Sequence, residues 1–396
     1  MNTFALLESR LANFDAIKTR SNLQTPKTQL PINAYCSEAI FKEEQRRIFD
    51  QASLYVGNQR LVPEQGDWLA LPQEDNGRVL IHNAHGVQLL SNVCRHRQAI
   101  MLGDADQLVR PSIPNRGNLG GANARIRCPL HAWTYNDTGK LIAAHKMTPT
   151  PCKHLDAFPL QSLSGFLFEG KRDVKGDIGH WFDLPEFDFS DYQLGHVELH
   201  SCHCNWKTFI EIYNEEYHIA PFHPGLRKYV ECNQIDWEFS DWGNLQRVGI
   251  NPNLRTGGTE LYEKWHQALL QHTGGTPPNF GAMWAAYYPT HMIEVYPYAL
   301  AISTLYPQGV HETLNLVEFY YPKQLLEDFP ELVESHHKAY METAAEDDEI
   351  AERIDAGRRA LYQRSRNEDG PYQTPLEDGM PHFHQWYRDM MGDALA

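Results

Sequence analysis

The chain has 396 residues, of which 42% are hydrophobic and 11% aromatic, so it can form two or three domains with a large core. Its formal net charge of −16 would repel nucleic-acid phosphates, which argues against a nucleic-acid partner. No apolar run reaches the roughly 18 residues that a membrane span needs, and the N-terminus lacks the basic start and apolar core of a signal peptide. We therefore expect a cytoplasmic protein that does not bind membranes.

The first half of the chain contains two regions with different sequence patterns. Residues 1–45 predict a short amphipathic helix and a proline-containing tether that pack on the larger domain expected over residues 169–396. Residues 46–168 carry short apolar runs between turn sequences such as residues 74–77 and 136–139, a pattern typical of a small all-β domain. Within this domain the Gly- and Asn-rich residues 115–123 predict a long loop.

Residues 169–396 predict a second, larger domain. Residues 205–217 contain neither Gly nor Pro and have helical periodicity. Residues 282–322 are rich in aromatic and β-branched residues between Pro breaks, which indicates successive strands. Residues 324–363 form the longest helical pattern, and a last short helix is expected from Pro381.

Two pairs of metal-binding residues lie in the predicted all-β domain, as Cys94-x-His96 and Cys128-x-x-His131. Each short spacing lets one loop present a thiolate and an imidazole to the same metal centre. Such a set fits one tetrahedral Zn²⁺, or a Rieske 2Fe–2S cluster in which two Cys hold one iron and two His the other. Zinc sites more often pair Cys with Cys and His with His, so the mixed pairs favour the Rieske cluster.

A second metal site is indicated in the larger domain. His218 and His223 follow the helix predicted over residues 205–217, with the helix breaker Pro221 between them. Two such side chains can converge on one metal, although the chain has 20 His and ordinary structural histidines are an alternative. A carboxylate would complete a 2-His-1-carboxylate triad, which leaves positions on Fe(II) open for O₂ and substrate.

The candidate carboxylates are adjacent in the long helix, at Glu346, Asp347 and Asp348. Asp347 shares one helix face with Tyr340, Thr343 and apolar residues further along, and it interrupts that apolar face. A carboxylate on a buried face is costly unless it is paired or bound to a metal, which favours Asp347 as the ligand. The alternative is that the acidic run forms a solvated helix face.

These motifs resemble those of the Rieske non-haem iron oxygenases, and the resemblance covers about residues 40–390. The sequence Glu215-x-Tyr217-His218-x₄-His223 is similar to the D/E-x-Y-H-x₄-H iron motif of that family, and Asp347 stands where the family has its third ligand. The resemblance therefore implies a cluster and a mononuclear Fe(II), bound by these residues: Cys94, His96, Cys128 and His131 for the cluster, and His218, His223 and Asp347 for the iron. One departure is the gap of 31 residues between His96 and Cys128, which is longer than usual and is expected to be a tolerated surface insertion.

The resemblance also implies the fold and the assembly. It implies an α+β chain with a small all-β Rieske domain (residues 46–168) and a helix-grip-like catalytic domain (residues 169–396), built from an antiparallel sheet and a long C-terminal helix. In the family, the acid at the position of Glu215 links the iron site to a cluster histidine of the neighbouring subunit. A head-to-tail homotrimer is therefore expected, with a reductase or ferredoxin as electron donor.

The activity that the resemblance implies is hydroxylation or oxidative demethylation of a small aromatic or quaternary ammonium compound, with O₂ as co-substrate. Glu215 stands where many ring-hydroxylating members have Asp, and this favours the quaternary-ammonium branch. An aromatic cage would suit such a cation, and five residues near the predicted strands are candidates for it, each of which could instead be ordinary core: Trp284, Tyr287, Tyr288, Tyr296 and Tyr298.

Two other classes stay open on the residues alone. One is a Rieske electron-transfer protein with an inactive mononuclear site, which would bind no iron beyond its cluster. The other is a zinc-bound interaction module, which leaves the larger domain without a role. Iron and sulfide contents distinguish these classes from the oxygenase.

Overall fold

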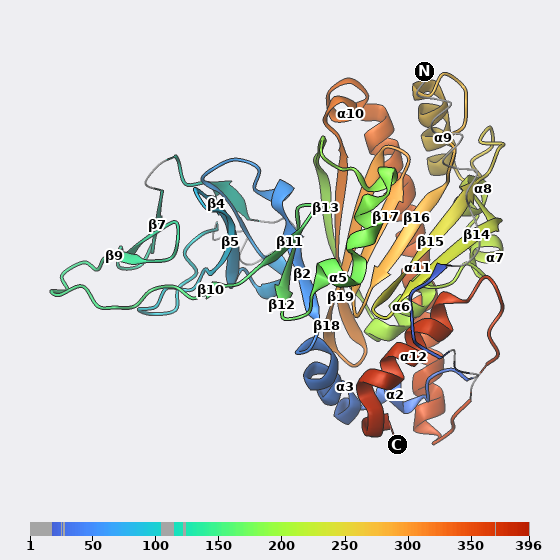
Figure 1. Cartoon of the computed structure of the whole chain (residues 1–396), viewed down its shortest axis with the longest axis horizontal. Coiled ribbons are helices and arrows are strands. Elements are labelled where there is room, and N and C mark those ends of the chain that lie inside the picture. Colours follow the sequence, from blue (N-terminus) through green and yellow to red (C-terminus); the bar gives the residue numbers. More distant parts are fainter. Residues whose placement is uncertain are drawn as a thin grey trace.

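The computed structural model describes residues 18–395, apart from residues 25, 27, 104–114, 122–123 and 369. The amphipathic helix expected at the N-terminus, on the pattern of Phe4, Leu7, Leu11 and Phe14, lies outside the described residues, because residues 1–17 are not among them. Figure 1 shows two parts, a small set of sheets on the left and a large sheet with its helices on the right. Among the helices that the structure describes, none is both long and apolar enough to cross a membrane.

The small part is all-β, as expected from its short apolar runs. It contains a five-stranded sheet of order β10-β5-β4-β3-β6 and two three-stranded sheets, β11-β12-β2 and β7-β8-β9. The strands are β2 Ser53–Asn58, β3 Asp67–Ala70, β4 Arg78–Asn83, β5 Gly86–Ser91, β6 Arg116–Asn118, β7 Arg125–Arg127, β8 Thr134–Asn136, β9 Leu141–Ala143, β10 Ala157–Phe158, β11 Gln161–Leu163 and β12 Phe166–Gly170.

The expectation of a continuous loop over residues 115–123 is wrong, because β6 lies within that stretch and pairs antiparallel with β3. Gly117 explains the difference. A Cβ atom at this position would lie 2.9 Å from the ring of Trp68, so the strand needs a glycine to pass under that ring. The glycine at this position therefore allows the backbone to pack closely against Trp68 and does not mark a turn.

The large part is built on an eight-stranded sheet of order β1-β14-β15-β16-β17-β18-β19-β13, antiparallel except for the pairing of β1 with β14. Its strands are β1 Lys18–Thr19, β13 Tyr192–Cys202, β14 Val230–Ser240, β15 Gly243–Ile250, β16 Ala282–Tyr287, β17 His291–Tyr296, β18 Ala299–Gly309 and β19 Glu312–Pro322. The expected α+β class, with an antiparallel sheet and a long C-terminal helix, is confirmed.

The helices surround this sheet (Figure 1). They are α2 Asn33–Cys36, α3 Glu38–Glu44, α5 Val174–Ile178, α6 Trp206–Tyr213, α7 Ile219–Phe222, α8 Leu226–Tyr229, α9 Glu260–His272, α10 Lys323–Asp328, α11 Pro330–Gln363 and α12 Gly379–Met391. Short segments of other helix types are η1 Gln45–Phe49, η2 Gln59–Leu61, η3 Pro72–Glu74, η4 Gly179–Asp183, η5 Pro185–Phe187 and η6 Gly392–Leu395.

Two predicted helices differ from the observed ones. The helix expected over residues 205–217 begins after its cap at Asn205 but ends at Tyr213, so the next four residues leave the helix. The helix expected over residues 324–363 is two helices, because the chain leaves helical geometry at Phe329 and restarts with a proline in the first turn of α11.

The two faces of the large sheet pack against different partners. Along β17 the side chains alternate, so that Glu294 and Tyr296 face α11 while His291 and Ile293 face the opposite way. His291 stacks on Tyr55 of β2 with ring centroids 4.3 Å apart, which joins the sheet to the small part. The face toward α9 and α11 therefore encloses the candidate site.

A buried ion pair holds α6 in place at one end of this sheet. Lys207 Nζ lies 2.5 Å from Glu44 Oε1, and both side chains are fully buried. Trp206 Nε1 and the Tyr387 hydroxyl also donate to Glu44, at 2.9 and 2.5 Å. One carboxylate thus ties α3, α6 and α12 together.

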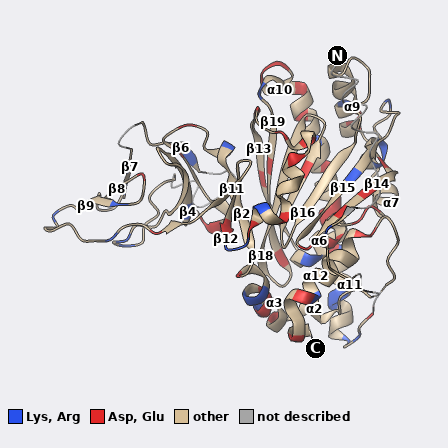
Figure 2. Cartoon of the chain, viewed as in Figure 1, with Lys and Arg blue, Asp and Glu red and all other residues tan. Residues whose placement is uncertain are grey.

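Acidic residues occur within the strands of the large sheet as well as on the helices (Figure 2). Three of them, Glu238, Glu294 and Glu318, are buried. Glu238 is paired with His180 and Arg247, at 2.7 and 3.1 Å. The other two have no such partner among the described residues.

Candidate functional site

The four Cys and His ligands expected for a cluster lie on two loops of the small part. One loop follows β5, and the other joins β7 to β8. Each loop is closed on itself by a backbone hydrogen bond, from Cys94 N–H to Ala99 O (2.9 Å) and from Cys128 N–H to Trp133 O (2.8 Å). These turns bring the two histidines together, with His96 and His131 ring centroids 4.7 Å apart.

The surroundings of these side chains fit a 2Fe–2S cluster. Cys94 and Cys128 are both buried free thiols, and the pKa of Cys128 is raised by burial and by the neighbouring Cys94 thiol. His96 stacks flat on Trp133, and its Nδ1 atom is buried without a hydrogen-bond partner among the described residues. Two adjacent thiols with two imidazoles beside them form the mixed donor set that a Rieske cluster requires.

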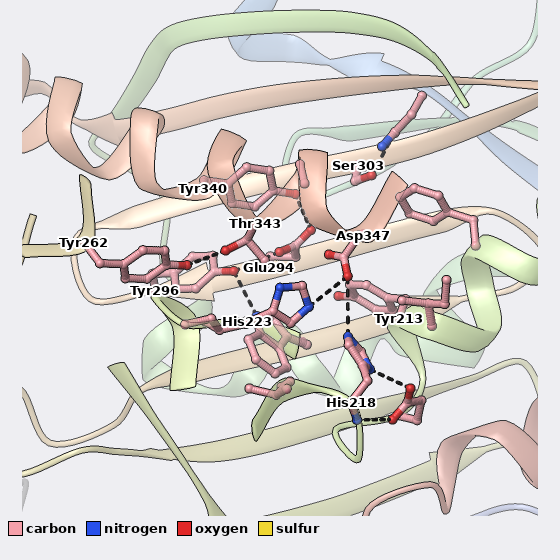
Figure 3. Close-up of a pocket in the computed structure, with 18 of the residues that line it drawn as sticks. Tyr213, His218, His223, Tyr262, Glu294, Tyr296, Ser303, Tyr340, Thr343 and Asp347 are labelled. Atoms are coloured by element: carbon pink, nitrogen blue, oxygen red, sulfur yellow. Dashed lines mark hydrogen bonds and ion pairs between the residues drawn. The ribbon is translucent and has the colours of Figure 1, made fainter. Parts of the chain in front are cut away.

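The residues expected to bind the mononuclear iron also come together (Figure 3). His218 precedes and His223 follows α7, a single helical turn that places both rings on one side, with centroids 4.9 Å apart. Asp347 comes from α11, and its Oδ1 atom lies 3.4 Å from His218 Nε2 and 3.1 Å from His223 Nε2.

The donor atoms of this trio fit a shared metal ion. One ligand atom of each residue lies within 4.8 Å of the others. His223 Nε2 and Asp347 Oδ1 are buried and have no hydrogen-bond partner among the described residues. Two imidazoles and one carboxylate on one side of a centre are the donor set of a facial triad.

The outer nitrogen of each histidine is held by an acid. His218 Nδ1 donates to Glu215 Oε1 at 2.5 Å, and His223 Nδ1 donates to Glu346 Oε2 at 2.7 Å. These bonds leave both Nε2 atoms directed at Asp347 and able to bind a metal. Burial lowers the pKa of His218, but the neighbouring carboxylates of Asp347 and Glu215 outweigh burial and raise the pKa to about 10.

For two of the acids around the histidines, the observed structure differs from what the sequence predicted. Glu215 was expected one helical turn before His218, but it lies beyond the end of α6 and reaches His218 across a turn. The role of Glu346 was missed, because the helical pattern distinguishes a buried acid from its neighbours but does not show which atom each acid contacts. Its only sequence signal was its place beside Asp347.

Glu211 of α6 is neither a helix-surface acid nor a capping residue, because it is buried and paired with residues of other segments. Arg358 Nη2 lies 2.6 Å from Glu211 Oε2, and His384 Nε2 donates to Oε1 at 2.7 Å. The hydroxyl of Tyr35 also donates to Oε1. Burial opposes ionisation, but Arg358 and these donors lower the pKa of Glu211 to about 2. The charged group fixes α6, which lines the cavity beside the trio, against α11, which carries Asp347.

A cavity opens beside the trio, between α11 and the large sheet. It offers about 90 Å³ to the centres of water-sized molecules, and a single water needs about 10–15 Å³ on that measure. The wall is mostly aromatic and apolar, with carboxylates at Glu215, Glu294 and Asp347 and no Lys or Arg among the described lining residues. The cavity thus suits a small molecule that is apolar, cationic or both.

Only part of the predicted aromatic cage lines this cavity. Trp284 and Tyr296 do, whereas Tyr287 donates to Asp177 (2.9 Å) on the opposite face of the sheet. The other two assignments are also wrong. Tyr288 is bonded to Asn244 at 2.8 Å, and Tyr298 lies in the turn after β17 with 38% of its surface exposed. Strand alternation separates positions 284 and 287, which the composition alone does not reveal.

Two family models match the chain. A model described as Rieske [2Fe-2S] domain matches residues 52–160. A model described as Ring hydroxylating alpha subunit (catalytic domain) matches residues 189–393, more than half of the chain. The matched regions contain the two cluster loops and the iron-site trio respectively.

Curated relatives are similar to nearly the whole chain. Putrescine 2-hydroxylase of Bordetella bronchiseptica is 56% identical over 368 residues, covering 93% of this chain and 86% of the relative. Putrescine 2-hydroxylase of Ralstonia nicotianae is 50% identical over 375 residues, covering 95% and 99%. The glycine betaine monooxygenase oxygenase subunit of Chromohalobacter salexigens is 23% identical, covering 98% and 91%.

Solved structures share the fold. The quaternary ammonium Rieske monooxygenase CntA in complex with L-carnitine has a TM-score of 0.68 at 18% identity, covering 92% of this chain and 95% of that chain. The expected oxygenase is confirmed, and nothing in these comparisons favours an electron carrier with an inactive site. The chain belongs to the Rieske non-haem iron oxygenases, as the catalytic alpha subunit that uses a 2Fe–2S cluster, a mononuclear iron and O₂.

Proposed function

We propose that this oxygenase hydroxylates a small aliphatic diamine, putrescine or a close analogue, at the second carbon of its chain. The relatives that are 56% and 50% identical bear this activity in their names, whereas the named quaternary ammonium oxygenases are 24% identical or less. The observation in the site that supports the proposal is the charge of the cavity. Its acids, and the lack of Lys and Arg among the described lining residues, favour a cation and disfavour a carboxylate substrate.

The proposed residue roles follow the geometry of the two sites. We propose that Cys94, Cys128, His96 and His131 hold the cluster, and that His218, His223 and Asp347 hold the iron. The bound cluster supplies electrons one at a time and the bound iron activates O₂, so that a C–H bond becomes C–OH and the second oxygen atom leaves as water with two electrons and two protons. Glu215 and Glu346 keep the two imidazoles oriented, and the aromatic wall excludes bulk water from the substrate.

We further propose that the enzyme works as a head-to-tail homotrimer. In Figure 1 the sheet β7-β8-β9, which carries one cluster loop, lies at the far left end, while α7 of the iron site lies at the right edge. Such separation within one chain favours an electron path between neighbouring copies, and heterologous contacts close into rings.

We propose that the chain divides into an N-terminal segment of residues 1–45, a Rieske domain of residues 46–168 and a catalytic domain of residues 169–396. We also propose that a reductase or ferredoxin supplies the electrons and that the enzyme is cytoplasmic.

A substrate panel tests this function. The purified enzyme, loaded with iron and cluster and coupled to a reductase, is supplied with putrescine, glycine betaine, carnitine or naphthalene, and the products are identified by mass spectrometry. Hydroxylated putrescine as the main product supports the proposal. Formaldehyde from a methylated amine, with no turnover of putrescine, identifies a quaternary ammonium demethylase and overturns it.

A further inference from the structure

One buried carboxylate in the cavity wall has no part in the proposed iron site. Glu294 of β17 accepts a hydrogen bond from the Tyr340 hydroxyl at Oε1 (2.7 Å) and from the Tyr296 hydroxyl at Oε2 (3.0 Å). Trp284 Nε1 donates to the Tyr296 oxygen at 3.1 Å, so the tyrosine proton is directed at the carboxylate. Figure 3 shows this acid in the same cavity as His223 and Asp347. The carboxylate is therefore held by one tyrosine hydroxyl at each oxygen, and it lines the cavity.

Glu294 lacks the cationic partner that Glu44, Glu211 and Glu238, which are also buried, each have. Glu44 is paired with Lys207 and Glu211 with Arg358, both within 2.6 Å. Among the described residues, no Lys, Arg or His forms an ion pair with Glu294. An isolated buried carboxylate is costly, and each of its oxygens can accept further hydrogen bonds. A cation that enters the cavity would remove this cost.

We propose that Glu294, held by Tyr296 and Tyr340, is the subsite that binds one terminal ammonium group of the substrate. This assignment rests on the proposed function and deepens it, because it says how the enzyme selects an amine. A primary ammonium has three donors and can bond to both carboxylate oxygens. Glu294 then acts in specificity and positioning and takes no part in O₂ chemistry.

The placement of Glu294 gives the subsite a fixed relation to the iron ligands. Tyr340 and Asp347 are both on α11 and both line the cavity. They are seven residues apart, or two turns and about 10 Å along the axis. Tyr340, which donates to Glu294, and the proposed ligand Asp347 are thus on one helix. A substrate anchored at Glu294 of β17 lies in the same cavity as the proposed iron ligands and presents its carbon chain toward them.

A second polar point in the cavity suits the other end of a diamine. Ser303 of β18 donates its hydroxyl to Asn315 Oδ1 at 2.8 Å, and both oxygens keep lone pairs that can accept from an ammonium group. Because Glu294 pairs with Ala301, Ser303 is its diagonal neighbour on the same sheet face, which corresponds to about 7–8 Å between such positions. Two acceptor points on the same sheet face of an aromatic cavity suit the two ends of a short diamine.

The ionisation of Glu294 is consistent with this role. Burial raises the pKa of Glu294 to about 7, although the bonds from Tyr340 and Tyr296 act in the opposite direction. Arrival of an ammonium group favours the ionised form, because an opposite charge within a few ångströms lowers the pKa of a carboxyl.

The chain provides a closely matched control in Glu318 of β19. Glu318 is likewise buried, and its Oε2 accepts from the hydroxyls of Tyr55 (2.6 Å) and Tyr320 (2.9 Å). Burial raises the pKa of Glu318 to about 7 as well. It does not line the iron cavity, because it faces β2 of the small part. Glu318→Gln therefore removes the same charge from the same kind of pocket without touching the proposed subsite.

Anaerobic titration calorimetry of the iron- and cluster-loaded trimer or monomer, as purified, tests the assignment with putrescine as the probe. Glu294→Gln is expected to raise the Kd for putrescine by at least about 30-fold, because it leaves a buried ammonium without its charged partner. Glu318→Gln is expected to leave the Kd within about 3-fold of wild type. Both variants are expected to keep three irons per chain, which shows that the sites remain loaded.

The outcomes separate the inference from the proposed function. If wild type hydroxylates putrescine and Glu294→Gln binds it as tightly as wild type, the inference is overturned and the function stands. If wild type binds and hydroxylates no diamine in the substrate panel, the function is overturned and this subsite with it. An equal loss of affinity in Glu294→Gln and Glu318→Gln would mean a general effect on the fold, and it also overturns the inference.

Discussion

His223 Nδ1 forms a hydrogen bond of 2.7 Å with Oε2 of Glu346, the residue that directly precedes Asp347 on α11. The same helical turn therefore supplies a carboxylate to each side of His223. Asp347 faces the Nε2 atom, at 3.1 Å, and Glu346 holds the opposite nitrogen. This arrangement sets both the ring orientation and the proton position of a proposed iron ligand.

The first prediction concerns Glu346. Glu346→Gln is expected to weaken Fe(II) binding by about 10- to 100-fold, because the acid that orients His223 is lost while the three proposed ligands remain. Iron titration of the cluster-loaded protein measures this affinity. Glu349→Gln is the matched control, since Glu349 lies on the same helix but pairs with the exposed Arg353. Equal iron affinity in the two variants would contradict the role of Glu346.

The second prediction separates the two metal sites. Asp347→Asn is expected to abolish hydroxylation and to reduce the iron content from three to two per chain, because a neutral amide is a poor third ligand for Fe(II). The Rieske signal in the reduced spectrum is expected to remain, since the cluster ligands are on separate loops. Loss of the cluster signal together with the mononuclear iron would show that the two sites are not independent.

The third prediction concerns the buried pair that holds α6. Lys207→Met is expected to destabilise the protein by about 3–5 kcal/mol, because it leaves Glu44 buried without its cation. Thermal unfolding followed by circular dichroism measures the effect. Lys264→Met provides the comparison, since the Lys264–Glu260 pair is exposed and its loss is expected to leave the melting temperature unchanged. Similar melting temperatures for both variants would contradict this role.

The fourth prediction concerns pH. Burial raises the pKa of Glu318 to about 7, above the ordinary value of 4.5, so the folded state binds this proton more tightly than the unfolded state. The stability that it contributes is fully present below about pH 4.5 and is lost as the pH rises through 7. Over that range wild type is expected to lose up to about 3 kcal/mol relative to Glu318→Gln. Parallel melting-temperature curves of the two proteins from pH 5 to 8 would refute this.

The sequence predicted which Cys, His and Asp residues lie together, because ligand chemistry imposes short local spacings. Cys94 and His96, or Cys128 and His131, must lie on one loop to reach the same centre, and that requirement is visible in the sequence. Asp347 was found by another local rule, since a charge on an apolar helix face needs a partner. These ligands are brought together as expected.

What the sequence did not reveal depends on contacts between distant segments. Glu294 lies in a strand that reads as ordinary buried β structure, and its partner Tyr340 is 46 residues away. The positions of Tyr287 and Tyr288 depend on the register and the length of β16, which composition does not determine. Strand β6 was missed because Gly117 serves the packing of Trp68, whereas glycines in a sequence are usually taken as turns.

The most direct test of the proposed chemistry is turnover of putrescine by the reconstituted enzyme under oxygen gas enriched in the heavy isotope ¹⁸O. We expect hydroxyputrescine that carries one heavy oxygen atom per molecule, with the other atom recovered in water and one putrescine consumed per O₂. Oxygen consumption that putrescine does not stimulate, or a product without the heavy isotope, would contradict the proposal that this chain is a diamine hydroxylase.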